Sequence, residues 1–156
     1  MANFVYLTQG RLHELENEVK DLKTNGRKQM ANTIAEARSY GDLSENAEYD
    51  AAKDAQGLLE LKISKLEDIL TRAQVVDTSK FPEDEIHILS TVIVKNLNNQ
   101  KEFTYILVSP EEADFQVGKI ALTSPVGQAL MGKKLGDKVQ ANAPAGVINF
   151  EILKID

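Results

Sequence analysis

Four acidic residues fall within a short stretch of the chain that contains no lysine or arginine. They are Asp42, Glu45, Glu48 and Asp50. Two carboxylates on one turn could bind a hard cation through oxygen. Because Mg²⁺ prefers octahedral coordination and keeps most of its waters, such a pair binds it weakly unless other ligands complete the shell. Carboxylates at the end of a rigid arm could therefore complete a two-metal centre in the active site of another molecule.

The same residues allow a purely structural interpretation. Asp42, Leu43, Ser44 and Glu45 have the spacing of a capping box. In that arrangement Asp42 or Ser44 caps the following helix, and both acids are favoured near the positive end of its dipole. Composition and spacing do not decide between a cap and a metal-binding pair.

Two seams of apolar residues at spacings of 3 and 4 predict two long helices around this stretch. The first seam contains Leu12, Leu15, Val19 and Leu22 and resumes at Met30, Ile34 and Ala37. The second contains Leu59, Ile63, Leu66, Leu70 and Ala73. Thr8 is placed as N-cap, so the first helix begins near residue 9. We expect a bend or a loosened turn at Asn25 and Gly26, because glycine weakens a helix.

The short link over residues 41–46 forces the two predicted helices to run antiparallel. Each would have about 30 residues, which gives a hairpin on the order of 45 Å long with the acids at its tip. After residue 75 the apolar period changes to two, which predicts strands. The predicted strands are 91–94, 103–108 and 148–152. A short helix should begin at Ser124 as N-cap and Pro125 as first residue, and Gly132 should close it.

The predicted fold class is therefore α+β, with a coiled-coil hairpin followed by a small, mostly antiparallel sheet and one short helix. The predicted ranges are 1–75 for the hairpin, with its acidic tip at 41–46, 76–83 for a linker and 84–156 for the sheet domain.

Composition excludes several classes of function. A chain of 156 residues with 42% apolar content can bury a core, and its net charge of −6 argues against gripping nucleic acid by bulk positive charge. The absence of cysteine excludes thiolate metal sites and thiol nucleophiles. No apolar run approaches the roughly 20 residues that span a bilayer, so we expect a soluble, cytoplasmic protein without a membrane partner.

Few other residues suggest chemistry. Lys20, Lys23 and Arg27 share one face of the first helix, either as solvated charge or as a patch that contacts an RNA or DNA backbone. His13 and His87 are isolated, so we expect both to be structural. The chain lacks a P-loop, a GxGxxG motif and the signature of a Ser-His-Asp triad, which argues against an enzyme with a small-molecule substrate.

The stretch from Glu36 to Lys53, EARSYGDLSENAEYDAAK, closely resembles the signature of the bacterial Gre factors, which are transcript-cleavage factors that act on RNA polymerase. The stretches 112–115 (EADF) and 124–133 (SPVGQALMGK) are similar to the C-terminal domain of that family. The resemblance covers essentially the whole chain. The run from Asn46 to Lys53 is more similar to the A-type members than to the B-type.

This resemblance implies a coiled-coil domain that enters the secondary channel of bacterial RNA polymerase and an FKBP-like domain that docks at the channel rim. Asp42 and Glu45 would help to hold a weakly bound Mg²⁺ shared with the polymerase and activate the water that cuts the nascent RNA. Arg38 and Lys53 would face the RNA or the polymerase.

Ser124 and Pro125 would lie on the docking surface. The implied function is that of a transcription elongation factor that rescues backtracked or arrested polymerase by stimulating Mg²⁺-dependent endonucleolytic cleavage near the RNA 3′ end. Such a factor supplies catalytic carboxylates to the polymerase and is no enzyme by itself.

Two other hypotheses remain open. A Gre-like protein could occupy the channel and inhibit polymerase without cleavage. An FKBP-like domain could also be a prolyl isomerase, but fold alone is a poor guide to activity. The chain has five Phe, four Tyr and no Trp, so we do not expect an aromatic pocket.

Overall fold

The computed structural model describes residues 3–41 and 46–156. The chain forms two compact units, Gly10–Arg72 and the combination of Met1–Gln9 with Ala73–Asp156. The helical unit is shorter at both ends than the predicted range 1–75, because the strands that flank its helices pair with each other and belong to the second unit. No helix of the described residues is long and apolar enough to cross a membrane.

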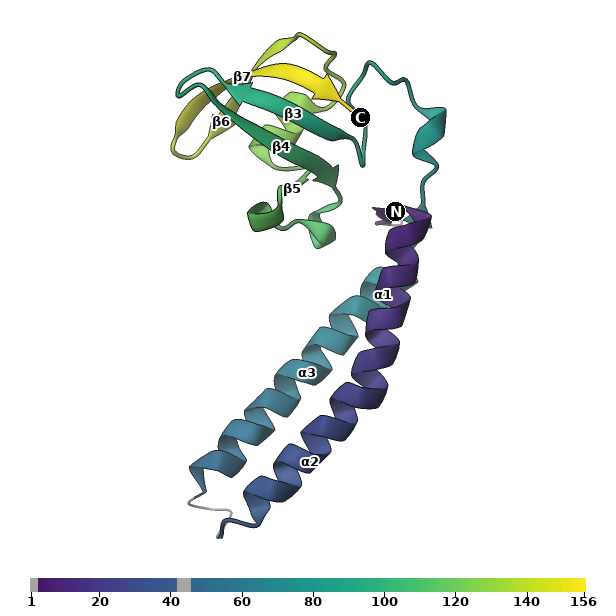
Figure 1. Ribbon diagram of the computed structural model, residues 1–156, viewed down its shortest axis with the longest axis vertical. Coiled ribbons are helices and arrows are strands. Elements are labelled where there is room, and N and C mark those ends of the chain that lie inside the picture. The colour runs from purple at the N-terminus through teal and green to yellow at the C-terminus, as the bar shows by residue number, and fades with distance from the viewer. Residues whose placement is uncertain (1–2, 42–45) are drawn as a thin grey trace. The chain divides into compact units, whose positions relative to one another are not determined.

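The helical unit is an antiparallel hairpin (Figure 1). Its elements are α1 (Gln9–Asp21), the π-helical turn η1 (Leu22–Gly26), α2 (Arg27–Arg38) and α3 (Ala47–Thr71). The predicted helix start near residue 9 is confirmed. Ala73, predicted as the last residue of the second seam, lies beyond α3 in a strand.

The π-helical turn reconciles two seams of unequal length. The seam of α3 keeps a strict alternation of 4 and 3 through Ala52, Gln56, Leu59, Ile63, Leu66 and Leu70. The facing seam runs through Leu22, Gly26, Met30 and Ile34 in three consecutive steps of 4, one residue more than a strict alternation contains. A π turn absorbs one extra residue, so the apolar side chains face α3 on both sides of it. The loosened turn predicted at Asn25 and Gly26 is this element.

The second unit contains a curled five-stranded sheet in the order β5-β4-β3-β7-β6 (Figure 1). Its strands are β3 (Thr91–Asn96), β4 (Lys101–Val108), β5 (Lys119–Ala121), β6 (Lys138–Ala143) and β7 (Gly146–Ile155). All neighbouring pairs are antiparallel except β4 and β5, which are parallel. The sheet is therefore mixed but mostly antiparallel, as predicted.

The short helix α4 (Pro125–Leu130) packs against β6 and β5. Leu130 is fully buried in the core of this unit, together with large side chains from the sheet. The ring of Tyr105 meets that of Phe150 edge to face, with centroids 6.4 Å apart. Three short 3₁₀ turns complete the unit: η2 (Thr78–Lys80), η3 (Pro110–Glu112) and η4 (Phe115–Val117).

A separate two-stranded parallel sheet joins β1 (Val5–Leu7) to β2 (Ala73–Val75). The side chains of Val5 and Leu7 are buried. The Tyr6 amide donates to the buried hydroxyl Oγ of Ser109 at 2.9 Å, which ties β1 to the residue that follows β4.

Candidate functional site

The two helix ends at the hairpin turn are held by one side chain. Oδ1 of Asn46 accepts hydrogen bonds from the amides of Glu48 and Tyr49, both at 3.1 Å, and thereby caps α3. The cap predicted at Asp42 or Ser44 is therefore wrong for this helix, because α3 begins at Ala47 with Asn46 before it.

The same side chain reaches across the hairpin. Nδ2 of Asn46 donates to the carbonyl oxygen of Ala37 in the last turn of α2. Ala37 is buried and packs with Ile34 and Ala52 in a small apolar cluster below the turn, against which Tyr49 is half-buried. Asn46 thus satisfies backbone groups at the end of one helix and at the start of the other.

The catalytic candidates Asp42 and Glu45 lie outside the described residues, between Gly41 and Asn46 in sequence. The other two acids, Glu48 and Asp50, are exposed in the first turn of α3, where the helix dipole favours negative charge. Among the described residues no group of three or more His, Asp or Glu side chains could hold a metal ion.

A phenol and a carboxylate are paired at the end of α2. The hydroxyl of Tyr40 donates to Oε1 of Glu36 at 2.9 Å. This hydrogen bond and the charge of Glu36 raise the pKa of Tyr40 above its usual value. Tyr40 is 61% exposed, so the pair is open to solvent.

The two basic residues that flank the turn both have partners within the hairpin. The guanidinium of Arg38 lies over the ring of Tyr49, 5.6 Å from its centroid. Nζ of Lys53 donates to Oε1 of Gln56 at 2.8 Å. Both side chains are on the surface. Contacts of Arg38 and Lys53 with RNA or polymerase stay a prediction.

The basic face of the first helix is largely matched by acids of α3. Nζ of Lys23 lies 3.1 Å from Oε2 of Glu67, and Nε of Arg27 lies 3.0 Å from Oε1 of Glu60. This compensation favours the solvated-charge interpretation over a patch that contacts a nucleic-acid backbone.

In the second unit, called the sheet unit below, Ser124 and Pro125 begin α4 as predicted. Oγ of Ser124 accepts from the amide of Gly127 at 3.1 Å and donates to the carbonyl of Ala121 at 2.6 Å. Gly132 follows the helix with a φ of 78°, in the left-handed region. The hydroxyl of Ser124 is therefore committed to the fold.

A mostly apolar groove of about 320 Å³ opens beside these residues. It is lined by Ala113, Phe115, Lys119, Ile120, Ala121, Ser124, Pro125, Val126, Ala143 and Pro144. Phe115, which lines the groove, is 75% exposed, and Val117 in the same turn η4 is 63% exposed. An apolar groove with an exposed aromatic residue is typical of a protein-binding surface.

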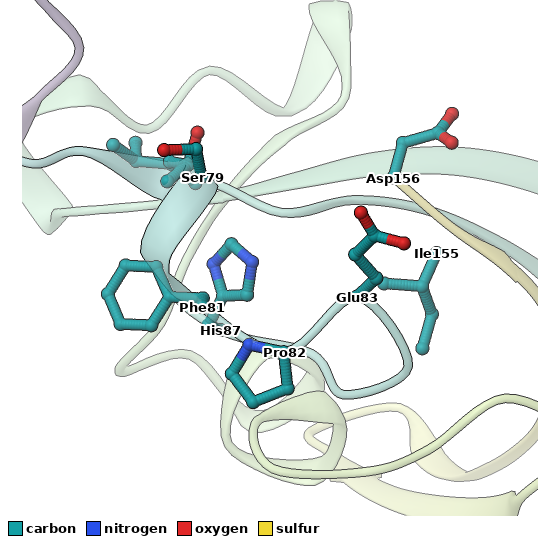
Figure 2. Close-up of a pocket in the computed structure, with 9 residues that line it drawn as sticks. Ser79, Phe81, Pro82, Glu83, His87, Ile155 and Asp156 are labelled. Atoms are coloured by element: carbon teal, nitrogen blue, oxygen red, sulfur yellow. The ribbon is translucent and has the colours of Figure 1, made fainter.

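A second cavity of about 490 Å³ lies between the linker and the end of β7. Figure 2 shows the Phe81 and His87 rings on one side of it and the carboxylates of Glu83 and Asp156 on the other. The two rings are stacked with centroids 4.4 Å apart, and Nδ1 of His87 lies 2.7 Å from the carbonyl oxygen of Ile88. These contacts fit the structural role expected for His87.

Two family models match almost the whole chain. The model described as "Transcription elongation factor, N-terminal" matches residues 5–75, and that described as "Transcription elongation factor, GreA/GreB, C-term" matches residues 81–156. The class defined by both halves is that of a transcription elongation factor. The chain belongs to the GreA/GreB family of these factors.

Individual relatives agree over the full length. The chain is 50% identical to Transcription elongation factor GreA of Chlorobium phaeobacteroides over 157 residues, covering 99% of this chain and 98% of the relative. It is 46% identical to the GreA of Chloroherpeton thalassium over 155 residues, with the same coverage. Among solved structures, Gfh1 of Thermus thermophilus is 26% identical over 99% of both chains, with a TM-score of 0.45.

Two features of these sites were not predicted from the sequence. The cap at Asn46 had a signal, because asparagine is as good a cap as aspartate or serine, but three candidates competed within five positions. The exposure of Phe115 and Val117 had none, since only the folded chain brings η4 beside Pro125 and Pro144.

Proposed function

We propose that this protein rescues backtracked or arrested RNA polymerase by stimulating Mg²⁺-dependent endonucleolytic cleavage near the nascent RNA 3′ end. Membership of the GreA/GreB family supports this function, and one structural observation carries the assignment of the chemistry to the tip. Since Asn46 caps α3, neither Asp42 nor Glu45 is needed for that structural role. The capping of α3 therefore places no demand on either carboxylate.

The proposed metal ion fits the donor set at the turn. Asp42 and Glu45 offer oxygen ligands, which Mg²⁺ prefers, but two carboxylates alone leave most of its octahedral shell to water or to a partner. When bound, the ion would lower the pKa of a coordinated water and stabilise charge on the phosphate. The proposed role of this chain is to carry the two carboxylates into the secondary channel of the polymerase on its helical hairpin.

The groove beside Pro125 is the proposed docking surface for the polymerase. Its apolar lining and the exposed Phe115 support this role. Ser124 contributes by holding the start of α4 in place through its bonds to Gly127 and Ala121. Docking by the sheet unit and chemistry at the hairpin tip would then be separate roles of the two units.

The test is RNA cleavage in stalled elongation complexes at several Mg²⁺ concentrations. We expect Asp42→Asn and Glu45→Gln to abolish stimulated cleavage without changing affinity for polymerase, because each removes a charged ligand and keeps the shape of the side chain. Asp50→Asn, which removes an acid from the first turn of α3, is the matched control and should cleave like the parent. Cleavage by both tip variants at the parent rate would overturn the proposal.

The alternative function is a channel regulator that inhibits polymerase without cleavage. It predicts slower RNA synthesis and no new RNA 3′ ends in the same assay, so one gel separates the two.

A further inference from the structure

We infer that Asn46 is a positioning residue for the tip acids, which it holds by tying the end of α2 to the start of α3. This inference rests on the proposed function of Asp42 and Glu45 and adds a residue to it. The observation behind it is that one amide side chain makes three hydrogen bonds to two different helices.

The orientation of the Asn46 amide is determined by its partners. The amides of Glu48 and Tyr49 are donors and can only face Oδ1, while the carbonyl of Ala37 is an acceptor and can only face Nδ2. All three hydrogen bonds come from the side chain of Asn46, which is half-buried. Rotation of the amide by 180° would break all three, so the side chain has one stable position.

The tie to Ala37 does not serve to stabilise a helix start. The cap of α3 is complete with Oδ1 alone. The bond from Nδ2 to Ala37 joins residues nine positions apart and fixes the separation of the two helix ends, between which the tip segment runs. Fixing both ends of a segment limits the positions open to its carboxylates, and a misplacement of about 1 Å can cost about 100-fold in rate.

A second contact also joins the end of α2 to the start of α3. Arg38 at the end of α2 lies over the ring of Tyr49, whose amide is one of the two that Asn46 caps. The polar tie and this cation–π contact therefore both join the last turn of α2 to the first turn of α3. Ala37 and Ala52 pack beneath them and keep the helices close.

The two functions of Asn46 can be separated by substitution. Asn46→Asp keeps an oxygen acceptor for the cap and replaces the Nδ2 donor by a second acceptor that repels the Ala37 carbonyl. Asn46→Ser keeps a capping oxygen, adds no charge and is too short to reach Ala37 while capping. Both variants should keep the parental helix content, because Asp, Ser and Asn are similar caps, and should melt only slightly below the parent, because each loses the bond to Ala37. Asn98→Asp is the matched control, since Nδ2 of Asn98 donates to the Val147 carbonyl at 3.1 Å in the sheet unit.

The experiment measures RNA cleavage in stalled elongation complexes at saturating and at limiting factor, with polymerase affinity measured separately. We expect Asn46→Asp and Asn46→Ser to lower the saturated rate about 10- to 100-fold at parental affinity and helix content, and Asn98→Asp to match the parent. The inference is overturned if Asn46→Ser cleaves at the parent rate, if only the charged Asn46→Asp is impaired, or if the loss follows a loss of affinity or of helix content. Asp42→Asn and Glu45→Gln, assayed in parallel, report on the proposed function: if they cleave normally that function fails, whereas if they are inactive and Asn46→Ser is not, only the positioning role fails.

Discussion

Arg27 of α2 and Glu60 of α3 form a two-point ion pair across the hairpin. Nε of Arg27 lies 3.0 Å from Oε1 of Glu60, and Nη2 lies 3.2 Å from Oε2. Each side chain is almost half exposed, so water and salt screen the attraction. The pair joins the helices immediately after the π turn, where the first helix resumes its regular geometry.

The ion pair predicts a small coupling energy between Arg27 and Glu60. In a double-mutant cycle of Arg27→Ala and Glu60→Ala, we expect a coupling of about 0.5 kcal/mol that weakens as salt is added. Urea unfolding of the four proteins measures it. A coupling indistinguishable from zero at low salt would show that the pair contributes nothing, and would return Arg27 to the candidates for RNA contact.

The helical unit was largely predictable because its apolar seams are local patterns. The start at Gln9 follows from the cap at Thr8, the antiparallel pairing from the short link over 41–46, and the seam residues of α3 from their spacing. The π turn was predictable only as a weak point at Gly26. Its type depends on comparing the two seams residue by residue, which requires knowing that Gly26 faces Leu59.

The sheet unit shows where such local patterns fail. β3, β4 and β7 alternate strongly and were predicted, whereas β1, β2 and β5 have only three residues each. β6 carries a real but weak signal, since its buried residues Val139 and Ala141 alternate with polar ones. Short strands are stabilised by partners far along the chain, so their own residues contain little evidence of them.

The first seam contains one residue more than the facing seam of α3, so one residue of the π turn should be dispensable for folding. Deleting Thr24, which is exposed in η1, should convert the turn to a regular α-helix while the apolar residues on both sides keep facing α3. We expect the variant to fold with a melting temperature equal to the parent's or higher. Circular dichroism and thermal unfolding provide the measurement.

The control for that deletion lies in α3, whose seam has no extra residue. Deleting Ser64 would rotate one half of the seam by about 100° relative to the other and expose either Ile63 or Leu66. The Ser64 deletion should lower the free energy of unfolding by several kcal/mol, about as much as a buried Leu→Ala substitution does. If the Thr24 and Ser64 deletions destabilise the hairpin equally, the register role of the π turn is wrong.

Two glycine substitutions should have opposite effects. A Cβ at Gly127 would lie 2.1 Å from the backbone oxygen of Ala121 and 2.8 Å from Cα of Leu122, so Gly127→Ala must push α4 away from the turn before it. We expect a loss of about 3 kcal/mol in the sheet unit. Gly57 in α3 has no neighbour within 4 Å of such a Cβ, and Gly57→Ala should stabilise the hairpin by about 0.5 to 1 kcal/mol. Denaturant unfolding of both variants tests the pair, and a neutral Gly127→Ala would contradict the close packing of α4.

The docking surface predicts a change in affinity without a change in stability. Phe115 is 75% exposed, so Phe115→Ser removes little buried area and should leave the unfolding curve unchanged. Affinity for polymerase should fall by about 10-fold or more if the ring is an anchor at the interface. Cleavage should recover at high factor concentration, because the tip is intact.

Leu135→Ser is the matched control for Phe115→Ser. Leu135 is 58% exposed and does not line the groove beside Pro125. Its substitution should leave polymerase affinity unchanged. Equal losses in both variants would argue for a general effect of surface polarity and against docking in the groove.

The contact between Tyr40 and Glu36 predicts how Tyr40 titrates. The hydrogen bond from the phenol to the Glu36 carboxylate, and then the charge of that carboxylate, raise the pKa of Tyr40 above its usual value of 10.0. Because the folded-state pKa is the higher one, the stability that this contact contributes is complete below pH 10 and is lost as the pH rises through the raised pKa. In Glu36→Ala the pKa of Tyr40 should fall toward 10.0, whereas in Glu48→Ala, which removes a weaker charge effect, it should fall less. Carbon-13 NMR of labelled tyrosine, with Tyr40→Phe to assign the signal, measures both shifts, and an unchanged titration in Glu36→Ala would disprove the contact in solution.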